Sequence, residues 1–151
     1  MRNMSAKPAW YGCKEVDCDV WMRYADEQLG FPYYAEEQDW GLSNTDGARI
    51  AEFLDFFDDH PLFPPSYKEL VAELIVASLD NGLLLGLVPA SLDLRIKDFM
   101  RKYWHEEFLA KNIVFFMELA DCPPENPNMV GRWLRRLMAA EPEAFPWPPR
   151  S

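Results

Sequence analysis

The stretch from Ser66 to Gly82 constrains the fold more than any other part of the chain. It contains no proline, its glycine stands at its end, and its apolar residues recur with helical spacing over more than one face. Ser66 and Glu69 have the spacing of a capping box, which starts a helix. A helix that is apolar on most sides has to be surrounded by other elements. We therefore expect a central core helix from Ser66 to about Asn81 or Gly82, which carries Leu70, Val71, Leu74, Ile75, Ala77 and Leu79.

Prolines and glycines divide the rest of the chain into pieces whose apolar residues also repeat with helical period. A first helix is predicted from about Asp17 to Leu29, with Gly30 as its stop signal. A second is predicted to begin at Asn44 or Thr45 and to end before the His60-Pro61 pair, with the polar residue at its start acting as a cap. A last helix is predicted to open at Asn126-Pro127.

The stretch 91–105 fits two interpretations. Leu92, Leu94 and Ile96 alternate as in a strand, whereas a helix aligns a longer apolar set that continues to Tyr103. The longer set favours a helix. The following run continues as a helix up to Cys122-Pro123, with a possible bend at the Trp104-His105 pair.

These elements predict one compact, all-α domain of about five to six helices. The chain has 151 residues, the usual length of one domain, and 49% of them are hydrophobic, which is enough for a packed core. The domain is expected to span 1–151, with 1–15 irregular or extended and with an extended, Pro-rich tail over 142–151.

The charge of the chain is negative and unevenly placed. The formal net charge is −10, and residues 1–60 hold 13 acids against 5 bases, whereas residues 61–151 hold 12 against 10. A chain of this sign repels phosphate backbones, so direct binding of nucleic acid is not expected. The compact basic cluster of Arg132, Arg135 and Arg136 is too small to change this. A partner with a positive surface is the more natural inference.

The cysteines and the apolar runs indicate a cytoplasmic protein. Nothing at the start resembles a signal peptide, and no run approaches the length of a membrane span. Cys13, Cys18 and Cys122, with His60 and His105, could supply zinc ligands, but their spacing is looser than in zinc knuckles. We therefore expect reduced cysteines, with Cys122 buried, no metal and no cofactor.

No catalytic motif is present. His60 follows Asp58 and Asp59, and His105 precedes Glu106 and Glu107, but neither histidine has a nucleophile at a recognisable spacing. An enzyme that uses His105 with Glu106 or Glu107 stays open as an alternative, and it predicts that these side chains converge in a cleft.

An acidic, aromatic region is the most distinctive feature of the first third of the chain. Between Arg23 and Arg49 there are six acids and no base, and the 31 residues from Trp10 to Trp40 hold eight aromatic rings. These rings could simply close the core. The alternative is a protein-binding surface, because tyrosine and tryptophan supply rigid contact area and carboxylates steer a basic partner. Because the predicted helices account for a core without these rings, the binding surface is favoured, and its candidate residues are Tyr33, Tyr34, Glu36, Glu37, Asp39, Trp40, Asp26 and Glu27.

In overall character the chain resembles the bacterial immunity proteins of polymorphic and contact-dependent toxin systems. The resemblance covers the acidic, helical composition and the central stretch "YKELVAELIVASLDNGLL". It implies a monomer or weak homodimer that neutralises a basic, nuclease-like toxin by covering its active site with carboxylates. An adaptor or scaffold subunit of a larger bacterial complex remains the alternative within the class of binding proteins.

Overall fold

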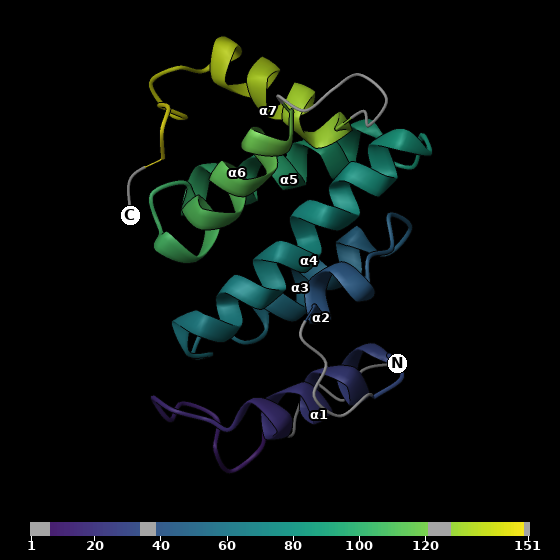
Figure 1. Cartoon of the computed structure of the whole chain (residues 1–151), viewed down its shortest axis with the longest axis vertical. Helices are drawn as coiled ribbons and strands as arrows, with labels where there is room; N and C mark the ends of the chain where they lie inside the picture. The colour runs from purple at the N-terminus through teal and green to yellow at the C-terminus, as the bar shows by residue number, and fades with distance from the viewer. Residues whose placement is uncertain (1–6, 34–38, 121–127, 150–151) are drawn as a thin grey trace.

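The chain folds into an all-α domain, as its sequence predicts. The computed structural model describes residues 7–33, 39–120 and 128–149, and these residues contain seven helices and no strand (Figure 1). The helices are α1 (Cys18–Leu29), α2 (Trp40–Ser43), α3 (Ile50–Asp58), α4 (Pro65–Leu84), α5 (Ala90–Tyr103), α6 (Glu107–Ala120) and α7 (Met129–Ala140).

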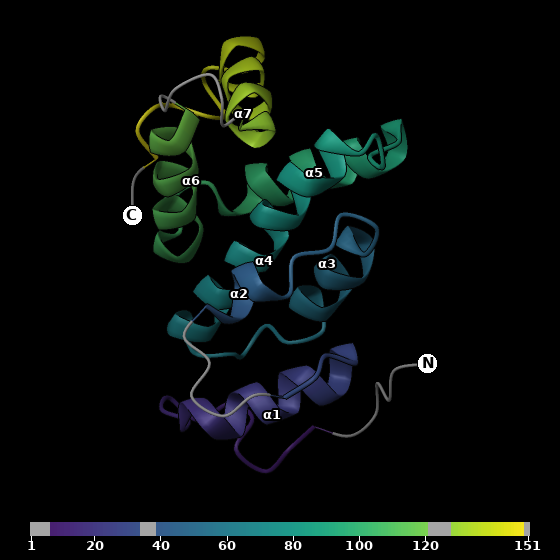
Figure 2. The ribbon, with the colours of Figure 1, turned by 45° about the vertical axis from the view of Figure 1, so that its right-hand side comes forward.

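Helix α4 is the central element. It packs against α2, α3, α6 and α7, and α1 lies at the opposite end of the molecule from α7 (Figures 1 and 2). Its apolar residues are buried on several sides, with Val71, Leu74, Ile75 and Leu79 fully inaccessible. The prediction of a surrounded core helix is therefore confirmed.

The predicted start of this helix is wrong by one residue, and its predicted cap is absent. The helix begins at Pro65 with Pro64 as its N-cap, and no side chain caps it. Ser66 is exposed and lies inside the first turn. Proline suits the first helical position because its missing N–H would have no partner there, so the capping box between Ser66 and Glu69 is not needed.

The predicted helix from Asn44 or Thr45 begins later than expected. Asn44 ends the short helix α2, and its side-chain amide donates to the carbonyl of Trp40 at 2.8 Å. The following turn packs directly on α4, where Asn81 Oδ1 accepts a hydrogen bond from the backbone N–H of Gly47 at 2.9 Å. A Cβ on Gly47 would lie 2.4 Å from the backbone nitrogen of Gly82. This close approach holds the chain in a turn, and α3 begins only at Ile50.

Helices α5, α6 and α7 follow the sequence more closely. The stretch with Leu92 and Ile96 is helical, within α5, and the predicted bend at Trp104 is a break between α5 and α6. Trp104 is fully buried, and its indole N–H donates to the carbonyl of Pro146 in the tail at 2.8 Å. Asn128 caps α7 by accepting from the N–H of Gly131, while the predicted start at Asn126-Pro127 lies outside the described residues.

Candidate partner-binding site

A hydrogen bond between two buried side chains joins α1 to α2. The indole N–H of Trp40, at the start of α2, donates to Oδ1 of Asp26 in α1 at 2.7 Å. Trp40 is 0% and Asp26 only 2% exposed. These two residues were predicted to contact a partner directly, and that prediction is wrong because neither reaches the surface. They anchor the connection instead.

The aromatic rings around this bond belong to the core. Trp21 packs edge-on against Trp40 with ring centres 5.1 Å apart, and it stacks on Tyr67 of α4 at 4.8 Å with nearly parallel planes. Phe31 lies edge-on to Trp40 at 5.8 Å. The rings join α1 and α2 to the central helix, so the expectation that the helices form a core without them is also wrong.

Arg23 and Arg49, which border the acidic, aromatic region in the sequence, pack against its aromatic rings. The guanidinium carbon of Arg23 lies 4.4 Å from the ring centre of Tyr33, and that of Arg49 lies 5.0 Å from the ring centre of Phe31. Both are cation–π distances. Each arginine also pairs with a carboxylate, Arg23 with Asp19 at 3.1 Å and Arg49 with Glu52 at 2.7 Å. Each arginine therefore has a carboxylate partner that lies outside the segment between them, and Arg49 also interacts electrostatically with Asp46 inside it.

Two predicted residues are exposed beside the buried bond. Glu27 follows Asp26 and Asp39 precedes Trp40, and both are exposed to solvent. Each of these exposed carboxylates is therefore next in the chain to one member of the buried bond. Tyr33 is half-buried under Arg23. The remaining candidates, Tyr34, Glu36 and Glu37, lie outside the described residues.

Glu73 of α4 interacts with Asp39 and Glu69, although the sequence did not single it out. We call the group of Glu27, Asp39, Glu69 and Glu73 the acidic edge. Burial raises the pKa of its carboxyl above the ordinary value, and the negative charges of Asp39 and Glu69 raise it further, while a hydrogen bond from the backbone of Leu42 acts in the opposite direction. Glu69 and Glu73 are four residues apart in one helix, a spacing that sets like charges on the same face. This spacing is the signal that could have identified them.

A cation from α6 partly balances this group. Lys111 Nζ lies 3.6 Å from Glu69 and 3.0 Å from Glu107. Lys111 is shared between two acids, so the cluster of Asp39, Glu69 and Glu73 keeps a net negative charge.

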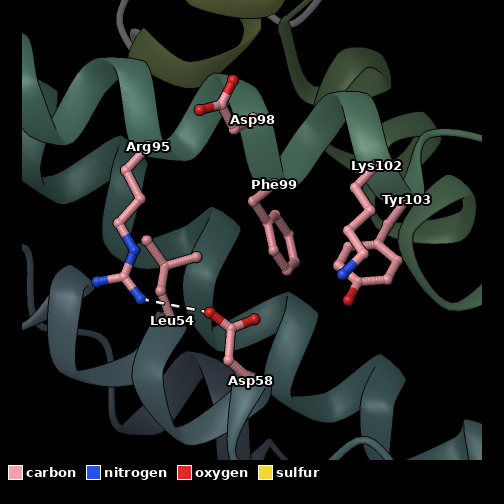
Figure 3. A pocket seen from close by; sticks show the side chains of 7 residues that line it. All are labelled: Leu54, Asp58, Arg95, Asp98, Phe99, Lys102 and Tyr103. Atoms are coloured by element: carbon pink, nitrogen blue, oxygen red, sulfur yellow. Dashed lines mark hydrogen bonds and ion pairs between the residues drawn. The ribbon is translucent and has the colours of Figure 1, made fainter.

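A separate hollow of about 180 Å³ lies between α3 and α5 (Figure 3). Arg95 of α5 reaches across it to Asp58 of α3 at 3.4 Å and also pairs with Asp55 at 2.6 Å, while Asp98 points away from α3. Leu54 and Phe99 form an apolar wall. These contacts make the hollow a narrow space between two helices that ion pairs bridge, and its lining contains no serine, threonine, cysteine or histidine.

The two histidines occupy different environments. His60 is buried and stacks on Phe63 with ring centres 4.5 Å apart. Its Nδ1–H donates to the carbonyl of Phe56 at 2.7 Å, so in the neutral ring Nε2 accepts from the hydroxyl of Tyr24, also at 2.7 Å. His105 is exposed in the connection between α5 and α6, with exposed Glu106 and Glu107 beside it. The burial and the hydrogen bonds of His60 therefore give it a packing role, whereas His105 lies at the surface.

The remaining candidates for metal binding are only partly described. Cys13 and Cys18 are exposed free thiols, and Cys122 lies outside the described residues. Within the ranges that the structure describes, no group of three or more metal-binding side chains comes together.

Comparisons of the chain with models of protein families, with curated proteins and with solved structures find no match. In the described part of the chain, no helix combines the length and the apolar character needed to cross a membrane.

Proposed function

We propose that this chain is a protein-binding protein that uses the acidic edge formed by α1, α2 and α4 to hold a basic surface of its partner. The observation that carries the proposal is the exposure of Glu27 and Asp39, two carboxylates that each lie next in the chain to one member of the buried bond between Asp26 and Trp40. Because the buried bond holds the neighbouring backbone in place, less conformational entropy is lost when these carboxylates bind a partner.

Electrostatics supports the same proposal. Burial raises the pKa of the Glu73 carboxyl, and the charges of Asp39 and Glu69 raise it further, so the ionised cluster destabilises the free protein. A lysine or arginine of a partner would relieve this repulsion on binding. Clustered charges of one sign also accelerate association with a surface of the opposite sign, and this acceleration declines as salt is added.

Within this class, we propose an immunity protein that neutralises a basic, nuclease-like toxin. A cleft that binds a phosphate backbone is positive, so carboxylates placed over it compete with the substrate. The net charge of −10 and the excess of acids over residues 1–60 are what such a partner requires.

An adaptor subunit is the second candidate, and a separate surface favours it. Leu84 and Leu85, at the end of α4, are 60% and 59% exposed, and Leu87 in the same loop is 41% exposed. Adjacent exposed leucines are typical of a surface that a permanent partner covers. An adaptor of this kind should associate or precipitate when purified alone, whereas an immunity protein has to be stable as a free monomer.

Co-expression with the protein encoded beside it in the genome tests the main proposal. The tagged full chain should capture that protein, and the complex should dissociate as salt is raised. The double variant Glu27→Lys/Asp39→Lys should capture much less of it. The matched control Glu118→Lys/Glu143→Lys changes the charge equally at two exposed sites near α7 and the tail, and it should retain capture. Equal capture by both variants, or no basic neighbour in the complex, would contradict the proposal.

A further inference from the structure

Helix α7 carries a row of positive charge on its outer face. Arg132, Arg135 and Arg136 are all exposed, and their spacing places them within one sector of the helix. The opposite face is buried through Val130, Trp133, Leu134 and Leu137. The row lies at the far end of the molecule from α1 (Figure 1).

Two hollows flank this row. One, of about 350 Å³, lies between α5 and α7 and is bordered by Arg136 and Trp133. The other, of about 280 Å³, lies between α6, α7 and the tail, and its walls are Met117, Met138 and Trp147 with Arg135 and Glu118 at the rim. Trp147 is 51% exposed, so this hollow presents apolar surface to solvent.

Two carboxylates beside the row accept hydrogen bonds from other donors, and one of them, Asp93, also interacts electrostatically with Arg136. Asp93 accepts from the indole N–H of Trp133 at 2.7 Å and pairs with Lys97 at 2.8 Å. Glu141 accepts two hydrogen bonds from Arg101, at 2.8 and 3.0 Å. With Glu118 counted against Arg135, and with Asp93 shared between Lys97 and Arg136, the described side chains of this face keep a net positive charge.

We propose that the outer face of α7 binds an acidic protein segment that carries a bulky apolar side chain. Guanidinium groups bind carboxylates through two parallel hydrogen bonds. The hollow next to Arg135 suits an apolar side chain, because methionine adapts to different shapes and tryptophan supplies rigid contact area. A segment that alternates acidic and apolar residues would use both features at once.

A nucleic acid fits this face less well. Its continuous phosphate charge would meet a protein of net charge −10, and it would leave the Met117, Met138 and Trp147 hollow unused. This surface is separate from the acidic edge of the proposed function, because the two carry charge of opposite sign. Experiments can therefore reject either proposal without the other.

Selection from a library of random peptides of about twelve residues displayed on phage, with the full chain as bait, tests the proposal. Counter-selection uses the variant Arg132→Glu/Arg135→Glu/Arg136→Glu. The selected peptides should be rich in Asp and Glu and contain Trp, Phe, Leu or Met. A synthetic selected peptide should bind the triple variant about tenfold more weakly or worse, and it should bind Trp147→Ala about threefold more weakly.

The matched control is Lys7→Glu/Lys14→Glu/Lys102→Glu, which changes the charge equally at exposed sites away from α7 and should bind the peptide as the wild type does. Circular dichroism verifies that each variant is folded. Failure to select acidic peptides, or equal binding to both triple variants, would overturn the proposal. Tighter binding of a single-stranded oligonucleotide, lost with the α7 variant, would overturn it in favour of nucleic acid.

Discussion

Replacing Trp40 by phenylalanine removes the indole N–H that donates to Asp26, one of the few buried acids of the domain. The aromatic contacts to Trp21 and Phe31 are largely kept by the smaller ring. The variant therefore isolates the anchor of the acidic edge. It should lower the free energy of unfolding more than a change of ring size alone.

The magnitude follows from two contributions. A hydrogen bond to a charged group contributes about 1.5–3 kcal/mol. The smaller ring leaves a cavity of roughly 40 Å³, which costs about 1 kcal/mol at about 24 cal/mol per Å³. The expected loss is therefore about 2.5–4 kcal/mol. This is less than the free energy of unfolding of about 5–15 kcal/mol that is typical of a domain, so the variant should stay folded.

Trp104→Phe is the matched control. Trp104 is also fully buried and also donates through its indole N–H, but its acceptor is the neutral carbonyl of Pro146. A neutral hydrogen bond contributes about 0.5–1.5 kcal/mol, so Trp104→Phe should cost about 1–1.5 kcal/mol less than Trp40→Phe.

Urea unfolding at pH 7, followed by far-ultraviolet circular dichroism, measures both losses by linear extrapolation. The slope of the free energy against urea should be unchanged. An equal loss in the two variants, or a larger loss for Trp104→Phe, would refute the anchoring role of the bond between Trp40 and Asp26.

Two further predictions concern α4 and its neighbours. Glu73→Gln should stabilise the protein at pH 7, because the raised pKa of Glu73 makes the folded wild type lose stability as the pH rises through that pKa. The gain in the free energy of unfolding should vanish well below pH 4.5, the ordinary pKa of the carboxyl. An equal gain at both pH values, measured by urea unfolding, would contradict this. Gly47→Ala should lower stability by about 2–3 kcal/mol, because its Cβ would lie 2.4 Å from the backbone of Gly82. Gly30→Ala, at φ +70° with nothing within 4 Å, should cost only about 1 kcal/mol, and thermal unfolding that ranks the two glycines in the opposite order would contradict the packing.

The helices that local signals define could be predicted from the sequence. Asp17 accepts hydrogen bonds from the backbone N–H groups of Asp19 and Val20, and Gly30 ends α1 in the left-handed region at φ 70°. Both signals act within one turn of the chain, so no knowledge of the rest of the fold was needed.

The segment between α2 and α3 could not be predicted in the same way. Asn44 and Thr45 have the composition of a helix start, but Ser78 and Asn81 of α4 accept the N–H groups of Asp46 and Gly47. These partners are more than 30 residues away in the chain. Tertiary hydrogen bonds therefore outweighed the local preference.

The candidate site was chosen from composition, and composition did not reveal that two of its residues, Asp26 and Trp40, are buried. Asp26 shares the apolar face of α1 with Met22, Ala25 and Leu29, a spacing that could have predicted its burial. The position of Trp40 had no such signal, because a connection between helices has no period from which an inward side can be inferred. Glu27 and Asp39 remain the exposed pair on which the proposed function rests.

The association rate constant with the protein encoded beside this chain tests the central claim most directly. Stopped-flow mixing at several salt concentrations should give a rate that falls as salt is added and that drops about tenfold in Glu27→Lys/Asp39→Lys. The control Glu118→Lys/Glu143→Lys should retain most of the wild-type rate. A rate that does not depend on salt, or that falls equally in the two variants, would contradict binding through the acidic edge.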